Sequence, residues 1–251
     1  MIKNILGRVW AVWGAIIFVL TLLIVVVPII LTNYIKEPRG TEIFRRISKA
    51  WMDVFLFSIG CPLVIKGKQH FKKGENYIVT SNHNSYMDVP VTTPYIPGPN
   101  KTIAKIEIAK APLFGPIYRR GSILVDRKSD RSRKESYLKM KETLSQGLHM
   151  CIYPEGTRNT TNEPLKSFHD GAFKLAIDTG KAIIPTLLFN TKKVLPGSSK
   201  PFYIWPAKLE MHFLAPVHVQ PGDTVTSLKE KVFGIMYAFC VEHNNKNKRN
   251  N

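Results

Sequence analysis

The sequence Tyr77-Ile-Val-Thr-Ser-Asn-His-Asn-Ser-Tyr-Met-Asp88 joins an apolar run to a short polar segment that ends in a carboxylate. Its first residues, 77–81, are rich in β-branched and aromatic side chains, which is typical of a buried strand. The tripeptide Asp88-Val-Pro90 is typical of the cap and first turn of a helix. We therefore expect His83 to lie in a tight loop between a strand and a helix.

His83 and Asp88 are a candidate pair for proton transfer. Five residues along one helix would turn the two side chains about 140° apart, so they can meet only if His83 lies outside the helix. Asp88 can then accept a hydrogen bond from one imidazole nitrogen and leave the other to accept a substrate proton. The spacing leaves one alternative open, in which Asp88 only caps the helix and His83 bonds to the backbone.

The composition describes a strongly basic chain of moderate length. Its 251 residues include 36 basic and 18 acidic side chains, for a net charge of +18. This length suits one catalytic domain with an accessory segment. The charge favours an anionic partner, which is nucleic acid, an anionic membrane surface or a phosphorylated substrate. Cys61, Cys151 and Cys240 form no CxxC pair, so we expect buried, reduced thiols and a cytosolic compartment.

The N-terminal part of the chain predicts attachment to a membrane. No charged residue occurs between Val9 and Leu31, and a helix of that length would reach about 35 Å, slightly more than the hydrocarbon core of a bilayer. Basic residues are more numerous after this segment than before it, which favours a cytoplasmic position for everything that follows. The sequence leaves open whether the segment crosses the bilayer or dips in and returns.

A second helix is expected from Glu42 to Ile59, with Gly60 as its end. Its apolar side chains recur at helical spacing among basic residues, which suits the membrane interface. An ordinary helix packed on the soluble domain is the alternative.

After Cys61, short strands alternate with helices. The expected strands cover residues 63–66, 77–81, 101–105, 122–125, 149–153, 182–189 and 208–214, and the last of them is antiparallel. The expected helices begin at Asp88 or cover residues 130–146, 171–179 and 227–242. This alternation predicts an α/β fold with a largely parallel sheet flanked by helices. We divide the chain into membrane-anchoring helices (1–60), the α/β domain (61–243) and a disordered tail (244–251).

Polar residues follow four of the expected strands. His83 and Asp88 follow the strand 77–81, and Lys105 ends the strand 101–105. Arg127 follows the strand 122–125, and the strand 149–153 is followed by Glu155, Gly156 and Arg158. Because the carboxyl ends of parallel strands meet at one edge of a sheet, we expect a single cleft. A glycine lets the backbone approach a phosphate closely, and an arginine can bind two of its oxygens. Taken singly, Arg127 could belong to a solvated turn and Arg158 to a local ion pair.

Four segments carry a resemblance to a known family. They are Asn82-His-Asn-Ser-Tyr-Met-Asp88, Gly121-Ser-Ile-Leu-Val-Asp-Arg127, Tyr153-Pro-Glu-Gly-Thr-Arg158 and Ile183-Ile-Pro-Thr186. In this order and at these approximate separations they resemble the four blocks of the glycerolipid acyltransferase family, and most of all its bacterial members that acylate 1-acylglycerol 3-phosphate. The resemblance covers residues 42–189. Two substitutions, in the second and fourth blocks, depart from the commoner residues and could alter the acyl pocket.

The resemblance implies a role for each matched residue. His83 would be the general base on a hydroxyl of a lysophospholipid, and Asp88 would orient its imidazole. The cations that would hold the substrate phosphate are Lys105, Arg127 and Arg158, in a pocket shaped by Glu155 and Gly156 with Thr157 as a further donor. The donor would be acyl-ACP or acyl-CoA, attacked directly, with no acyl-enzyme, cofactor or metal. The apolar residues 111–118 would line an acyl tunnel, unless they only pack in the core.

The product implied by the resemblance is phosphatidic acid, made for membrane phospholipid synthesis at the cytoplasmic face of the inner membrane and without a nucleic acid partner. Three alternatives remain. The acceptor could be glycerol 3-phosphate or another lysophospholipid, or the enzyme could be a hydrolase that uses Ser85, although the GxSxG nucleophile elbow is absent. A membrane-tethered protein that only binds anionic ligands would explain the charge without catalysis.

Overall fold

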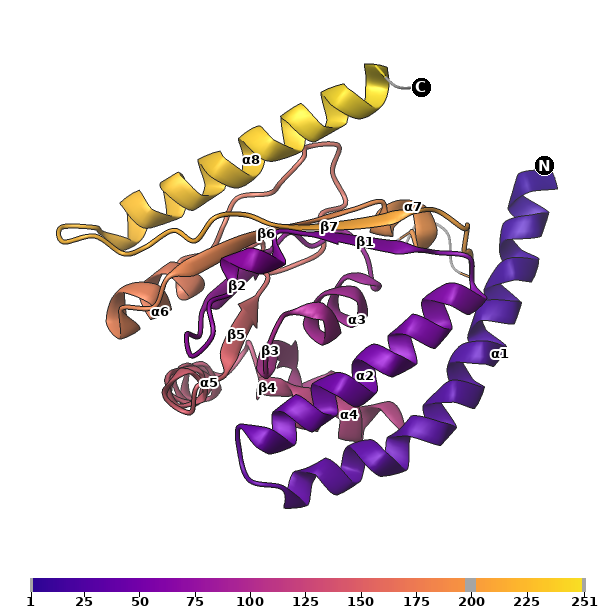
Figure 1. Cartoon of the computed structure of the whole chain (residues 1–251), viewed down its shortest axis with the longest axis horizontal. Helices are drawn as coiled ribbons and strands as arrows, with labels where there is room; N and C mark the ends of the chain where they lie inside the picture. Colours follow the sequence, from indigo (N-terminus) through magenta and orange to yellow (C-terminus); the bar gives the residue numbers. More distant parts are fainter. Residues whose placement is uncertain (1, 197–201, 250–251) are drawn as a thin grey trace.

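The computed structural model describes residues 2–196 and 202–249, and its helices cover both faces of one sheet (Figure 1). The strands are β1 (Leu63–Lys66), β2 (Ile78–Ser81), β3 (Asn100–Lys105), β4 (Ser122–Val125), β5 (His149–Ile152), β6 (Ile183–Phe189) and β7 (Leu209–Phe213). The helices are α1 (Ile2–Leu31), α2 (Arg39–Ser58), α3 (Asp88–Thr92), α4 (Phe114–Gly121), α5 (Asp130–Ser145), α6 (Gly171–Thr179), α7 (Thr191–Val194) and α8 (Val225–Arg249). Short 3-10 turns are η1 (Thr32–Tyr34), η2 (Lys68–His70), η3 (Thr93–Tyr95) and η4 (Ile106–Lys110).

The sheet has seven strands in the order β1-β7-β6-β2-β5-β3-β4. The five strands from β6 to β4 are parallel, while β7 is antiparallel to β6 and pairs in parallel with β1. The predicted α/β fold with a largely parallel sheet is confirmed, as is the antiparallel strand. The carboxyl ends of β2, β3, β4 and β5 therefore meet at one edge, where the sequence placed the cleft.

Two hydrophobic clusters explain why the central strands are apolar on both faces. Neighbouring residues of a strand point to opposite faces, so Ile78 joins the cluster under α5, α6 and α8, whereas Val79 joins the cluster under α1, α2 and α3. All four residues of β2 and of β5 are buried. Burial on both faces is the usual environment of a parallel strand covered by helices.

Helix α1 lies alongside α2 rather than projecting from the domain (Figure 1). It is long and apolar enough, by length and composition, to cross a membrane. Its glycine face contacts the rest of the chain: a side chain at Gly7 would begin 2.2 Å from the ring of Tyr203. Trp10 donates a hydrogen bond to the Ile59 carbonyl, and Trp51 donates one to Thr21 of α1. Most other apolar side chains of α1 are exposed, which indicates association with a membrane.

Helix α2 is amphipathic, as expected, and begins at Arg39 rather than Glu42. Its buried face packs Phe44, Trp51 and Phe55 into the same cluster as α1 and the sheet. Its other side leaves Phe57 88% exposed. One face of the helix packs on the domain, as the alternative above expects, and its place at a membrane interface stays a prediction that the exposed Phe57 is compatible with.

The turn between α1 and α2 is joined to the domain by a buried ion pair. Arg120, at the end of α4, donates hydrogen bonds to Glu37 (2.7 Å) and Thr32 (3.0 Å). Burial acts to raise the pKa of Glu37, but the hydrogen bonds from Arg120 and Thr41 outweigh it and lower that pKa to about 2. The carboxylate is therefore ionised at neutral pH and holds the helical hairpin on α4.

The C-terminal helix extends further than the sequence predicted. Helix α8 begins at Val225 and continues to Arg249, so residues 244–249 of the expected disordered tail are helical, and residues 250–251 lie outside the described residues. An ion pair one turn apart, Lys246 with Glu242 at 2.6 Å, supports the extension. Adding residues to an existing helix costs little compared with starting one, so the polar tail continues it.

All three cysteines are buried and free, as expected. Burial raises the pKa of the Cys151 thiol to about 12. A thiol in that environment stays protonated and is a poor nucleophile.

We expect acid to destabilise the fold through His149. This side chain accepts a hydrogen bond from the Tyr77 N–H at Nδ1, so Nε2 carries the proton donated to the Pro97 carbonyl. Burial lowers the pKa of His149 from 6.5 to about 4. Below pH 6.5 the unfolded chain therefore binds more protons than the folded one, and the free energy of unfolding falls by about 2 kcal/mol between pH 7 and pH 5.

Urea unfolding of the detergent-solubilised chain at the two pH values measures this loss. The variant His149→Asn should be less stable at pH 7, and its loss of stability between pH 7 and pH 5 should be smaller than that of the wild type by about the same 2 kcal/mol. His218→Asn, at an exposed histidine, should keep the wild-type loss. An unchanged pH dependence in His149→Asn would contradict the assignment.

Candidate active site

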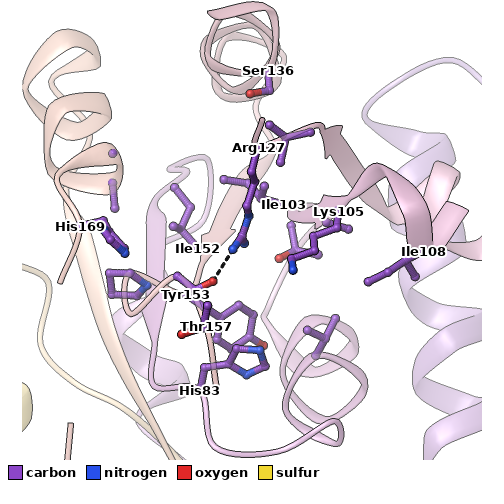
Figure 2. Close-up of a pocket in the computed structure, with 18 of the residues that line it drawn as sticks. His83, Ile103, Lys105, Ile108, Arg127, Ser136, Ile152, Tyr153, Thr157 and His169 are labelled. Carbon is purple, nitrogen blue, oxygen red and sulfur yellow. Dashed lines mark hydrogen bonds between the residues drawn. The ribbon is translucent and has the colours of Figure 1, made fainter. Parts of the chain in front are cut away.

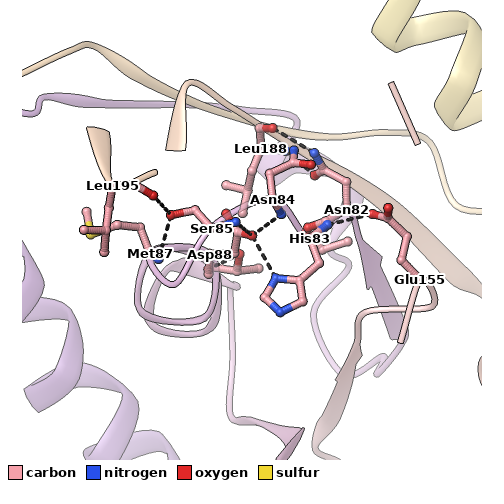
Figure 3. A network of polar contacts seen from close by, with 11 residues as sticks. Asn82, His83, Asn84, Ser85, Met87, Asp88, Glu155, Leu188 and Leu195 are labelled. Atoms are coloured by element: carbon pink, nitrogen blue, oxygen red, sulfur yellow. Dashed lines mark hydrogen bonds and ion pairs between the residues drawn. The ribbon is translucent and has the colours of Figure 1, made fainter. Parts of the chain in front are cut away.

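The loop between β2 and α3 is organised by one carboxylate oxygen (Figure 3). Asp88 Oδ2 lies 2.8 Å from His83 Nδ1 and also accepts hydrogen bonds from the N–H groups of Asn84 and Ser85. Because Asp88 is the first residue of α3 and reaches back into the loop, its contacts are not those of an N-cap. The helix-cap interpretation of Asp88 is therefore wrong, and the predicted contact between the two side chains is present.

Asp88 is fully buried, whereas the His83 side chain is 19% exposed. With Nδ1 directed at the carboxylate, the other nitrogen of His83 faces the cavity drawn in Figure 2. The ring also lies against Tyr153, with centroids 4.7 Å apart. Burial raises the pKa of the Tyr153 hydroxyl well above its usual value, so this neighbour stays neutral.

Glu155 supports the loop through hydrogen bonds to the backbone and does not line the cavity. Its Oε1 accepts a hydrogen bond from the His83 N–H at 2.7 Å, and its Oε2 accepts one from the Lys166 N–H at 2.9 Å. The side chain is only 2% exposed, and this burial raises the pKa of Glu155. Sequence reasoning placed Glu155 at the site but did not identify these backbone contacts, which hold two loops together.

Asn82 is a second support that sequence reasoning did not assign. Its amide donates to the Leu188 carbonyl at 2.9 Å and accepts from the Leu188 N–H at 2.7 Å. Leu188 belongs to β6, so this pair of bonds continues the β2–β6 ladder by one residue into the loop. The sequence signal for this supporting role is the amide side chain itself, because it can both donate and accept a hydrogen bond.

The cavity beside His83 has a volume of about 460 Å³. It is lined by residues from the ends of four neighbouring strands, as predicted: His83, Lys105, Arg127, Gly156, Thr157 and Arg158. No Asp, Glu or Cys of the described residues lines it. A set of cations with an imidazole and no carboxylate suits an anion better than a metal ion.

Two of the arginines that line the cavity, Arg127 and Arg158, are held by neutral partners. Arg127 donates to the Gly156 carbonyl at 2.6 Å, and the Arg158 guanidinium lies over the ring of Tyr86 and donates to its hydroxyl at 2.9 Å. These contacts orient the guanidinium groups and leave their charge uncompensated. Arg127 is exposed in the turn that follows β4, so the solvated-turn interpretation describes its position, although the residue also lines the cavity. The expected local ion pair of Arg158 is not found, because its recorded partner among the described residues is Tyr86.

Gly156 is required at its position because its backbone is left-handed and because a side chain there would clash with its neighbour. Its φ is +70°, and a Cβ there would lie 2.6 Å from the ring of His169. His169 itself lines the cavity, as does Arg133 of α5. Sequence reasoning singled out neither, because their places depend on how α5 and α6 pack over the sheet edge.

Ser85 does not face His83. Its hydroxyl donates to the Leu195 carbonyl at 2.7 Å and accepts from the Met87 N–H at 3.1 Å, and the residue is fully buried. A nucleophile needs a hydrogen bond to its base and access to substrate. The geometry therefore contradicts the hydrolase alternative.

Comparison with known proteins identifies relatives of the whole domain. The family model described as "Acyltransferase" matches residues 62–188. The chain is 27% identical over 183 residues to "1-acyl-sn-glycerol-3-phosphate acyltransferase" of Borreliella burgdorferi, covering 72% of this chain and 70% of that protein. It is 28% identical to the chloroplastic protein of the same name, LPAT1, of Arabidopsis thaliana, covering 73% of this chain but only half of that longer protein.

One solved structure shares the complete fold. The crystal structure of the 1-acyl-sn-glycerophosphate (LPA) acyltransferase, PlsC, from Thermotoga maritima superposes with a TM-score of 0.82 and covers 96% of this chain and 98% of that one. The two sequences are 19% identical. The likeness extends beyond the sheet, since this coverage includes the N-terminal helices.

We expect Glu155→Gln to loosen the His83 loop. Both oxygens of Glu155 accept backbone N–H groups, and an amide would present a donor to one of them. Leaving one buried N–H unpaired costs about 1–3 kcal/mol. Amide hydrogen exchange at His83 and Lys166 should become faster, while Glu163→Gln, at an exposed glutamate, should leave both rates unchanged. Equal exchange in the Glu155 variant and the wild type would contradict this role.

Proposed function

The chain belongs to the acyltransferase family, and from this premise we propose that it transfers an acyl chain from acyl-ACP or acyl-CoA to the sn-2 hydroxyl of lysophosphatidic acid. The product would be phosphatidic acid. One observation supports this reaction above all: the His83–Asp88 pair opens into a cavity lined by four cationic side chains, Lys105, Arg127, Arg133 and Arg158. The names of the relatives from Borreliella burgdorferi and Arabidopsis thaliana agree with it.

In the proposed mechanism, His83 is the general base. The free imidazole nitrogen takes the proton of the acceptor hydroxyl as its oxygen attacks the thioester carbonyl carbon. The tetrahedral intermediate then collapses, the C–S bond breaks, and the imidazolium returns the proton to the leaving thiolate. Asp88, held by the loop amides, fixes the imidazole tautomer and stabilises the transient positive charge.

The substrate phosphate would lie among Lys105, Arg127 and Arg158, with the Thr157 hydroxyl as a further donor. The cations come from the ends of three different strands, so they line one cavity without being neighbours in the sequence. Lys166 adds a further cation beside the cavity, because its ammonium donates to the Thr157 hydroxyl at 2.7 Å. Each hydrogen bond between one of these cationic side chains and the phosphate would be worth about 1.5–3 kcal/mol.

The acyl chains would enter from the membrane side. A small apolar cavity between the N-terminal helices and the sheet is lined by Phe18 of α1, Phe44 of α2 and Phe114 of α4. It shares Tyr118 and Val89 with the cavity at His83. This continuity supports the acyl-tunnel role for part of residues 111–118 over simple core packing.

The N-terminal helices would hold the domain on the cytoplasmic face of the inner membrane. Helix α1 contacts the rest of the chain from Gly7, beside Tyr203, to Ile29, which is fully buried. A helix packed along its length on the domain cannot also stand upright across the bilayer apart from it. We therefore place the α1–α2 hairpin within one leaflet, with its exposed apolar side chains among the lipid tails.

We expect His83→Ala to lower kcat for acyl transfer by a hundred- to ten-thousand-fold, because general-base help is typically worth that much. The measurement uses labelled acyl-ACP or acyl-CoA and lysophosphatidic acid in mixed micelles. His218→Ala should retain full activity, and Ser85→Ala should retain most of it.

Two results would overturn this proposal. Near-normal transfer by His83→Ala would contradict the proposed role of His83 as the general base. A wild-type protein that binds phosphatidic acid but transfers no acyl chain would be only an anionic-lipid binder. Transfer to glycerol 3-phosphate in preference to lysophosphatidic acid would correct the acceptor.

We expect Arg127→Ala to raise KM for lysophosphatidic acid by about ten- to a hundred-fold, since one charge-assisted contact to phosphate is lost. With a monoacylglycerol, which lacks the phosphate, the variant and the wild type should differ little. The matched control is Arg131→Ala, because Arg131 lies on the exposed surface of α5 paired with Glu135. An equal loss with both acceptors would place the phosphate elsewhere.

A further inference from the structure

A group of three potential metal ligands lies where α8 passes over β7. Glu210 and His212 are two residues apart on β7 and so project from the same face of the strand, and His243 projects from α8. Glu210 Oε2 lies 3.2 Å from His212 Nε2 and 4.0 Å from His243 Nε2. One atom from each residue lies within 4.8 Å of the other two.

The group is enclosed and incompletely satisfied. His212 is only 6% exposed, and Glu210 and His243 have side chains that are 15% and 13% exposed. Within the described part of the chain, His243 Nε2 is buried and has no hydrogen-bond partner. A buried nitrogen without a partner destabilises the folded chain. A bound metal ion or an acceptor for its proton would remove this cost.

Aromatic rings fix the two imidazoles. Phe189 stacks on His243 with centroids 3.8 Å apart, and Phe239 lies against His212 at 5.2 Å. Rings held in this way lose little further freedom when they bind an ion. A cavity of about 310 Å³, lined by His212, His243 and Phe239 among others, leads to the group from solvent.

We propose that Glu210, His212 and His243 bind one divalent ion of the zinc class, which joins α8 to the sheet. Two imidazoles and one carboxylate suit zinc and its neighbours better than magnesium or calcium, which prefer oxygen ligands. In a tetrahedral site with bonds of about 2.0–2.1 Å, ligand atoms are roughly 3.3 Å apart. Glu210 and His212 already have about this separation, whereas His243 has to move by roughly 1–1.5 Å, because the ligand atoms lie up to 4.8 Å apart.

The charged residues around the group also allow an arrangement without a metal ion. Lys208 lies 3.5 Å from the other oxygen of Glu210, Lys66 is the register partner of His212, and Lys246 is paired with Glu242. A plain ion pair of Glu210 with Lys208 and His212 satisfies the carboxylate. It leaves His243 Nε2 without a partner, whereas an ion would use all three side chains.

The proposed ion is separate from the acyl-transfer chemistry. Neither Glu210, His212 nor His243 lines the cavity at His83, and the proposed mechanism needs no metal. The role of the ion would be structural, since it links the last part of α8 to the antiparallel strand β7. Water from the cavity would complete its coordination.

The test uses the full chain in detergent micelles, without an affinity tag and stripped of metal with a chelator. Zn²⁺ is titrated against a chromophoric competitor, and Co²⁺ is added separately because its visible absorption reports four-coordination. The variants are Glu210→Gln and His243→Gln, which keep side-chain size, and the control is His218→Gln. Far-UV circular dichroism confirms that each variant is folded.

We expect one Zn²⁺ per chain, an intense Co²⁺ absorption, and a rise in Tm of roughly 5–10 °C at a hundredfold excess of Zn²⁺ over Kd. The two ligand variants should bind Zn²⁺ at least a hundredfold more weakly and lose the rise in Tm, while His218→Gln behaves as the wild type. Sub-stoichiometric Zn²⁺ binding by the wild type, or equal binding by the ligand variants, would overturn the proposal. Loss of binding in His218→Gln as well would indicate adventitious surface binding and would also overturn it.

Discussion

The site depends on one buried carboxylate oxygen, Asp88 Oδ2. It accepts the N–H groups of Asn84 and Ser85 and contacts His83 Nδ1. These contacts give the loop its shape and leave only one imidazole nitrogen to face the cavity. The same interactions that fold the loop therefore hold the carboxylate against the imidazole.

The loop is held from two further directions, and neither support faces the cavity. Glu155 accepts the His83 N–H from the β5 side, and Asn82 extends the ladder towards β6. Because β2 lies between β5 and β6 in the sheet, the loop that carries His83 is fixed by both neighbours of its own strand. Side chains held by packing and by such outer contacts keep the short distances that proton transfer requires.

The membrane helices and the catalytic sheet share one hydrophobic cluster. Phe18 of α1, Trp51 of α2 and Phe114 of α4 meet beside the edge of the sheet, and Arg120 ties the α1–α2 turn to α4. An anchor packed in this way sets the distance between the bilayer and the site. In the proposed reaction, a two-tailed product would then remain in lipid while its headgroup reaches His83.

The sequence alone determined the order of the seven strands, the largely parallel sheet, most of the helices and most of the residues at the candidate site. It did not predict α4 or α7. Alternating apolar runs set the fold, because burial follows their period, and His83, Asp88, Lys105, Arg127 and Arg158 could be found because each follows a strand whose direction was predictable. The tertiary structure alone decided how these side chains are held. The backbone contacts of Glu155, the place of His169, the inward turn of Ser85 and the meeting of Glu210 with His243 all join segments far apart in the chain. No local pattern encodes such contacts, since they depend on which elements the core brings together.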